Sequence, residues 1–372
     1  MKTHFTTKVI HRSIGSMGLL LAALLLTGCP AQNTTPTDSF DRTAMLTQVA
    51  DGTIMPSYDA LWTSTADLTA TVATFTSAPS QQSLAASKEA WLAVADAWQD
   101  ARPFDFGPAE GLFGNLAENI GTYPASAEKI EAFVAAGDTS LSGFDRDARG
   151  IYGVEFLLFA ENDDAVVTAF QDPLRCAYLR AVVSGMHAEI TQVREAWMTG
   201  YRTEFISRNG TEPGSGTSLL FNNMVRSYEQ LKNYALGLPL GRVAGQTQAE
   251  PEKVEGLYSN RSTALAKRHY ASVMRIWQGE SLEKTPILGF RQYLNAVPNG
   301  DRLMLSTLEQ DVEVSRAFGQ IHEAEPLHVL ITSDPARVET LHTECQKLTR
   351  FLKSDLSSLL GLAITFSSGD GD

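Results

Sequence analysis

The chain has 372 residues, of which 43% are hydrophobic and 20% charged, a composition typical of globular proteins and not of disordered or fibrous ones. Its length is sufficient for two domains of ordinary size. The net charge of −13 at pH 7 argues against nucleic acid as a partner, because binding to a phosphate backbone needs a basic surface.

Residues 1–28 have the pattern of a lipoprotein signal peptide. Basic residues precede an apolar run at 14–26, which is too short to span a bilayer. Small residues lead into Cys29, the position that is acylated in bacterial lipoproteins, and acyl chains would anchor the protein in a membrane. Residues 29–40 read as a flexible tether. Since Pro30 and not aspartate follows the cysteine, we expect the outer membrane, facing the periplasm. The alternative is an ordinary secretory signal with an incidental cysteine.

From residue 41 onward the apolar residues recur at helical spacing, and sustained β alternation is hard to find. A loop rich in Gly, Ser and Pro at 207–217 separates a first half, 41–206, from a second half, 218–372. The sequence therefore predicts an all-α protein of two helical bundles in tandem. The expected helices are 44–75 (with a break near Gly52 and Pro56), 81–100, 124–136, 147–160, 173–205, 219–236, 263–277, 303–321 and 335–360.

The helix at 147–160, with the sequence DARGIYGVEFLLFA, is apolar on nearly every side, which is typical of a buried helix. It contains Glu155, and Tyr152 lies three residues earlier on the same helical face. A buried carboxylate is costly unless it is hydrogen-bonded, paired with a cation or bound to a metal. Two interpretations follow. Either Glu155 is a structural residue paired with Arg149 or Arg102, or it belongs to a ligand site.

Histidines are few, and the HExxH signature of zinc proteases is absent from the sequence. Two Glu-x-x-His pairs, Glu325/His328 and Glu339/His342, have the spacing found in di-iron bundles. Pro326 lies inside the first pair, and the second pair lies beside the apolar stripe of its helix. We therefore do not favour a di-iron centre.

Two cysteines follow Cys29, namely Cys176 in the first half and Cys345 in the second. In an oxidising compartment they could form a disulfide between the halves. Their sequence positions do not fix the distance between them. Two separate buried thiols are an equally good interpretation.

Several segments together resemble the imelysin family of bacterial envelope proteins, also classified as M75 peptidases. The resemblance implies an all-helical protein of two related bundles, with a site where the halves meet and a role in iron acquisition or metal handling. The segments are 91–108 (W-x6-W followed by RPFDFGP), 119–134 (NIGTYPASAEKIEAFV), 149–160 (RGIYGVEFLLFA), 257–279 (LYSNRSTALAKRHYASVMRIWQG) and 359–372 (LLGLAITFSSGDGD).

The family's motif is G-x-H-x-x-E, and this chain departs from it at one position. Gly150 and Glu155 match the motif, whereas Tyr152 stands in place of the histidine. Imidazole is the better ligand for a transition metal. A tyrosine can hydrogen-bond a ligand or, as phenolate, coordinate ferric iron. The departure argues against the peptidase activity.

The leading hypothesis is a non-enzymatic, lipid-anchored envelope protein that binds iron or another divalent metal, an iron complex, or a partner in iron uptake. Glu155 would be the anionic centre, with Tyr152 as its neighbour in metal binding. The other expected ligand-binding residues are Gly150, Arg149, Asp147 and Arg102 in the first half, and Tyr258, Ser259 and Ser262 in the second. One alternative is an M75-type metallopeptidase in which His269 supplies a metal ligand. Another is a structural lipoprotein in which an ion pair between Glu155 and an arginine only fixes packing.

Overall fold

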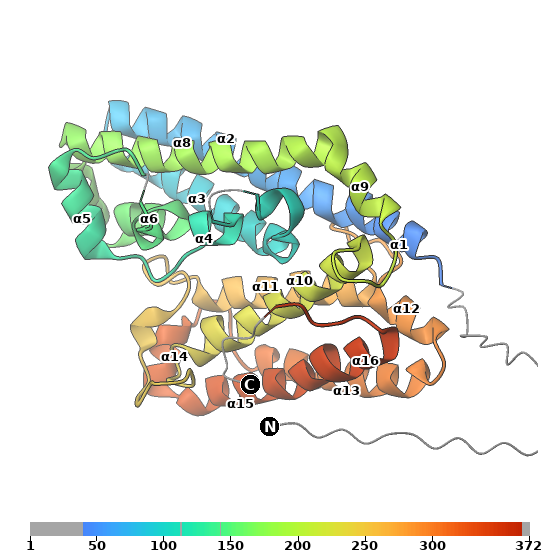
Figure 1. The fold of residues 1–372 in the computed structure, drawn as a ribbon. Coiled ribbons are helices and arrows are strands. Elements are labelled where there is room, and N and C mark those ends of the chain that lie inside the picture. The colour runs from blue at the N-terminus through green and yellow to red at the C-terminus, as the bar shows by residue number, and fades with distance from the viewer. Residues whose placement is uncertain (1–39, 112–113, 142, 367–372) are drawn as a thin grey trace, which may run out of the picture. The chain divides into compact units, whose positions relative to one another are not determined.

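The computed structural model describes residues 40–111, 114–141 and 143–366, and these residues are predominantly helical (Figure 1). The described residues contain no strand, only an isolated bridge between Glu280 and Pro286. The all-α prediction is confirmed. The predicted signal peptide, Cys29 and all but the last residue of the predicted tether lie outside the described residues. None of the helices in the described ranges is both long and apolar enough to cross a membrane.

The first half is built on three long helices that pack against one another: α2 lies against both α3 and α8 (Figure 1). Leu84, Trp91 and Trp98 of α3 are fully buried and recur at helical spacing, which explains why this face turns inward. The described helices of this half are α1 (Arg42–Val49), α2 (Met55–Ser77), α3 (Gln81–Ala101), α4 (Leu116–Ile120), α5 (Ala127–Ala136), α6 (Gly150–Phe159), α7 (Asp163–Ala169), α8 (Pro173–Ala196) and α9 (Arg202–Ser207).

In the second half, α13 packs against α15, and the apolar stripe predicted for α15 is buried. The stripe includes Cys345, a fully buried free thiol. Cys176 is also buried and free, so the two cysteines form no disulfide. The described helices of this half are α10 (Gly216–Gln230), α11 (Ser262–Gln278), α12 (Phe290–Ala296), α13 (Gly300–Gly319), α14 (Leu327–Ser333), α15 (Pro335–Arg350) and α16 (Leu356–Leu360).

The predicted helix boundaries hold to within a few residues, except at breaks and in short elements. The break expected near Gly52 and Pro56 in the helix 44–75 is confirmed: a π-helical segment at Ala50–Ile54 divides it, and α2 begins at Met55. The helix expected at 335–360 has a similar interruption at Phe351–Asp355. The seven-residue helices α7, α12 and α14 were not predicted, because two turns contain too few residues to show a period.

The two halves meet along α3 and α11. Asp100 of α3 is buried and forms ion pairs with Arg268 at 2.6 Å and Arg275 at 3.1 Å, both from α11. The predicted boundary loop lies between the end of α9 and the start of α10. The described residues belong to one compact unit, so the division into domains at 207–217 stays a prediction.

Candidate functional site

Gly150 begins α6 and brings its first turn against the end of α4. Its φ angle is +68°, in the left-handed region that favours glycine. A Cβ atom at this position would lie 2.5 Å from the carbonyl oxygen of Ile120. Neighbouring side chains hold the same turn: Trp91 Nε1 donates to the carbonyl of Ile151 at 2.8 Å, and the Tyr178 hydroxyl to that of Ala148 at 2.6 Å. The motif glycine therefore sets where the rest of α6 can lie.

Replacing Gly150 with alanine is expected to lower the free energy of unfolding by about 2 kcal/mol or more, because the left-handed backbone and the contact with Ile120 both oppose a Cβ atom. Urea unfolding measures the effect. Gly200→Ala is the matched control, since nothing lies within 4 Å of the added atom. Equal stability of the two variants would contradict this role of Gly150.

Glu155 is 2% exposed and receives two hydrogen bonds on its Oε1 atom from Ser259 of the second half. The backbone nitrogen of Ser259 lies 2.8 Å away and its hydroxyl oxygen 2.6 Å. Burial raises the pKa of Glu155 to about 7, although the hydrogen bonds from Ser259 act in the opposite direction. Near neutral pH this carboxyl group is therefore divided between its protonated and ionised forms.

Tyr152 does not face Glu155 but donates its hydroxyl hydrogen to Oε1 of Glu255, which is also 2% exposed. Nη1 of Arg102 lies 3.0 and 3.1 Å from the two carboxylate oxygens of Glu255. Gln99 donates to Oε1 of Glu255 at 2.9 Å. Burial, together with the charge of Glu255, raises the pKa of Tyr152 well above its ordinary value. The tyrosine is thus a neutral donor and not a phenolate.

One short loop supplies both second-half contacts, because Glu255 and Ser259 are four residues apart. The loop turns through two left-handed residues, Gly256 at φ +69° and Asn260 at φ +60°. The two contacts are reciprocal: Glu155 of the first half accepts from the loop, whereas Glu255 in the loop accepts from the first half. We call this set the junction cluster; it consists of Gln99, Arg102, Tyr152, Glu155, Glu255 and Ser259.

The structure brings some of the predicted residues into the junction cluster and corrects one prediction. The predicted ion pair of Glu155 with Arg102 or Arg149 is wrong. Arg102 pairs with Glu255. Arg149 donates to the carbonyl of Leu141 and to the Asn119 side chain. Both Arg102 and Glu155 find their partners in the loop that carries Glu255 and Ser259. The helical periods of the sequence do not reveal where this loop packs.

The remaining predicted residues lie around the cluster. Tyr258 places its ring edge against Phe156, with ring centroids 5.4 Å apart. Asp147 pairs with Lys129 at 3.0 Å. The Ser262 hydroxyl accepts a hydrogen bond from the backbone amide of Leu327 at 2.8 Å. Tyr258, Asp147 and Ser262 therefore make local structural contacts.

Glu255 and Gln99 were missed at the sequence level. Glu255 follows Glu252, Lys253 and Val254 and precedes Gly256-Leu257, so its surroundings in the sequence are less apolar than those of Glu155. It lies two residues before the segment 257–279 that carries the family resemblance. That nearness is the one signal that could have identified Glu255, whereas its pairing with Arg102 depends on the tertiary fold.

The two carboxylates of the junction cluster are bonded by protein donors, which fits a structural hydrogen-bond network better than a resident metal ion. Both oxygens of Glu255 face the Arg102 guanidinium, and Oε1 of Glu155 accepts twice from Ser259. In the described part of the chain, no three His, Cys, Asp or Glu side chains gather to hold a metal. His269 contacts the Ser227 hydroxyl at 2.8 Å. Metal coordination by Glu155 and Tyr152 stays a prediction that this donor set does not favour.

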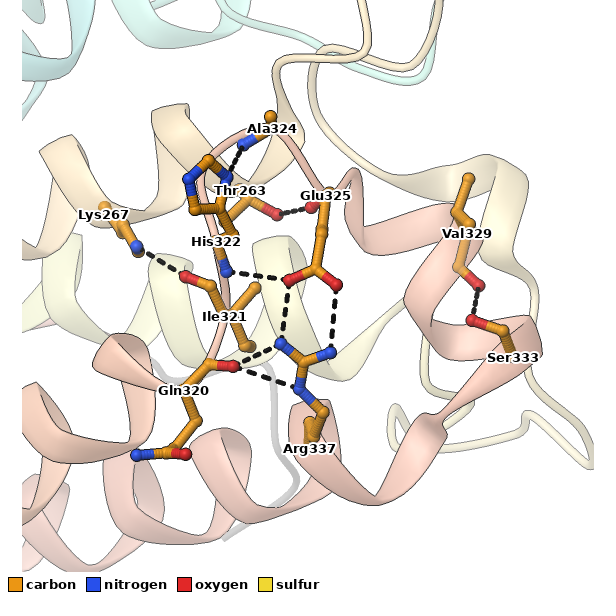
Figure 2. A network of polar contacts seen from close by, with 10 residues as sticks. All are labelled: Thr263, Lys267, Gln320, Ile321, His322, Ala324, Glu325, Val329, Ser333 and Arg337. Carbon is orange, nitrogen blue, oxygen red and sulfur yellow. Dashed lines mark hydrogen bonds and ion pairs between the residues drawn. The ribbon is translucent and has the colours of Figure 1, made fainter.

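The two Glu-x-x-His pairs have structural roles. Figure 2 shows that Glu325 places both carboxylate oxygens on the Arg337 guanidinium, at 3.1 and 2.8 Å, and accepts the backbone amide of His322. Glu339 pairs with Arg242 at 2.9 Å. Both glutamates are therefore engaged by arginines. The absence of a di-iron centre stays a prediction, and the engagement of both glutamates supports it.

Comparisons with known proteins support the resemblance. A model of the family described as Imelysin, peptidase M75, matches residues 54–352. Iron-regulated protein A of Synechococcus elongatus is 22% identical over 238 residues. The match covers 62% of this chain and 62% of that protein, so the chain spans less than two thirds of that relative's length.

Two crystal structures share the fold. An imelysin-like protein from Psychrobacter arcticum superposes with a TM-score of 0.68 at 22% identity, covering 87% of this chain and 97% of that chain. A putative iron-regulated protein A precursor from Parabacteroides distasonis gives a TM-score of 0.71 at 18% identity, covering 86% and 95%. Since the family model also matches most of its length, the chain belongs to the imelysin family.

Proposed function

We propose that this chain is a non-enzymatic binding protein of the bacterial cell envelope, anchored through Cys29 at the outer membrane, that takes up an iron complex where its halves meet. The link to iron rests on relatives that carry the name iron-regulated protein A. The location rests on the lipoprotein pattern of residues 1–28. The place of the site is inferred from the junction cluster, which includes Tyr152 and Glu155 of the family motif.

The observation that supports an iron complex over a bare ion is that both carboxylates of the junction cluster already have partners within the protein. A bare ion would have to displace Arg102 from Glu255 or Ser259 from Glu155, and each displacement leaves a buried polar group without its partner. An iron complex brings its own ligands. It needs the protein to supply charge and hydrogen bonds, and Arg102 already places a cation at this junction.

Titration of the purified protein with ferric citrate and with iron alone tests the proposal. We expect stoichiometric binding of the complex, weakened at least tenfold by Glu155→Ala, because the loop bearing Glu255 and Ser259 loses its anchor on α6. Glu161→Ala, at an exposed acid just beyond α6, is the control and should leave the affinity unchanged. Tight binding of iron alone, or no binding of the complex, would contradict the proposal.

The second candidate is a purely structural role of the Glu155 contact, which the internal partners of the two carboxylates also favour. In that case Glu155→Ala lowers the free energy of unfolding by disconnecting the loop, yet leaves the ferric citrate titration unchanged. The two candidates therefore differ in one readout, the affinity of the folded Glu155→Ala variant for the iron complex.

A further inference from the structure

A pocket of about 260 Å³ lies beside the junction cluster, between the first half and helix α10 of the second. Residues of the segment 115–123, around α4, line one side, and Tyr123 packs its ring against Tyr152 at 5.3 Å between centroids. Arg102 is also part of the lining and is 8% exposed. Arg102 thus lines the pocket and also pairs with the buried carboxylate of Glu255.

The other side of the pocket is a stripe of polar residues on one helical face. Arg226, Gln230 and Tyr234 line it, spaced by four along α10 and its π-helical continuation, Leu231–Gly237. Within the described residues, none of these three side chains makes a hydrogen bond or an ion pair. Tyr234 is 44% exposed and Arg226 is half-buried. The stripe therefore presents unused donors to one concave surface.

The acidic groups near the pocket are engaged elsewhere. Glu118 pairs with Arg146 at 2.5 Å, and Glu255 pairs with Arg102. Asp105 is buried and accepts the backbone amide of Ala117; burial raises the pKa of its carboxyl group to about 6, although the charge of Arg226 opposes this shift. Asp105 forms no ion pair with Arg226. An arginine without a bonded counter-charge thus faces a pocket in a chain of net charge −13.

We propose that this pocket binds a small oxygen anion bearing carboxylate or phosphate groups, with Arg226 as its charge partner and Gln230 and Tyr234 as hydrogen-bond donors. A guanidinium group presents paired N–H donors that match the two oxygens of such a group. The volume suits a small molecule and not a polymer. Anion binding by this pocket does not depend on the proposed function. Only the further statement that the anion is the ligand that carries iron rests on it.

Calorimetric titration with citrate, inorganic phosphate and ferric citrate tests the pocket directly. We expect Arg226→Gln to weaken anion binding at least tenfold, and Tyr234→Phe about threefold, because a charged hydrogen bond contributes more than a neutral one. Arg316→Gln is the control, since that arginine is exposed and pairs with Glu313 on α13. The citrate and phosphate arms identify which oxygen anion the pocket accepts.

Unchanged affinity in folded Arg226→Gln, or no binding of any of the three anions, would overturn the inference. Tyr234→Phe keeps it testable if Arg226→Gln is unstable, because Tyr234 is exposed and its hydroxyl has no partner to lose. The outcomes also separate the two proposals. Citrate binding that depends on Arg226 without any ferric citrate binding supports the pocket and refutes the iron role. Ferric citrate binding that Arg226→Gln leaves unchanged supports the iron role and refutes the pocket.

Discussion

Replacing Arg102 with methionine is expected to lower the free energy of unfolding by about 3 to 5 kcal/mol, because the change leaves the carboxylate of Glu255 buried without its cation. The side chains of Arg102 and Glu255 are 7% and 2% exposed, so water cannot replace the lost charge. Urea unfolding at pH 7, followed by circular dichroism, measures the loss.

Two further variants show that the loss arises from an isolated buried charge. Adding Glu255→Gln to Arg102→Met should restore much of the stability, since the unpaired charge is gone while the amide oxygen still accepts from Tyr152 and Gln99. Arg316→Met breaks an exposed ion pair with Glu313 and should cost less than about 1 kcal/mol. If Arg102→Met were no more harmful than Arg316→Met, the junction cluster would not hold the halves together as described.

The stability of the protein is expected to fall as the pH rises from about 4.5 to above 7, with Glu155 contributing about 3 kcal/mol of that fall. Burial raises the pKa of Glu155 from 4.5 to about 7, so the folded protein holds a proton in this range that the unfolded chain has released. The stability contribution is complete below pH 4.5. It is lost as the pH rises through the folded pKa.

Glu155→Gln isolates this contribution, because the amide cannot ionise and still offers an oxygen to Ser259. We expect the variant to match the parent protein near pH 5 and to exceed its free energy of unfolding by about 3 kcal/mol at pH 8. Asp105 has a raised pKa in both proteins, so its effect cancels in the comparison. Parallel stability curves for the two proteins would contradict a buried, proton-holding Glu155.

Long helices could be predicted from the sequence because their apolar stripes are repeated over several turns. The stripe of α3 and that of α15 are both buried as expected. The seven-residue helices were missed because they contain too few turns to show a period. The break near Gly52 was predicted, but not its π-helical form, which depends on contacts made after folding. Gly52, for example, lies in a π-helical segment, and its carbonyl accepts the backbone amide of Leu282 from the second half.

The candidate site was only half predictable for a related reason. An acid within an apolar run signals burial, and this identified Glu155. The sequence does not reveal which cation or donor a buried acid meets, and Arg102 and Tyr152 both turned out to contact Glu255. The stripe of Arg226, Gln230 and Tyr234 is visible as a spacing of four, but only the fold shows that it faces a pocket beside the family motif.

Anomalous diffraction at the iron absorption edge, from crystals grown with ferric citrate, tests the central claim most directly. The account predicts one iron peak in the pocket lined by Arg226 and Tyr234, with the ligand's oxygen atoms on the Arg226 guanidinium and the junction cluster intact. An iron peak within bonding distance of Glu155 and Tyr152 would contradict it. So would the absence of an iron peak from the pocket in crystals grown with a saturating concentration of ferric citrate.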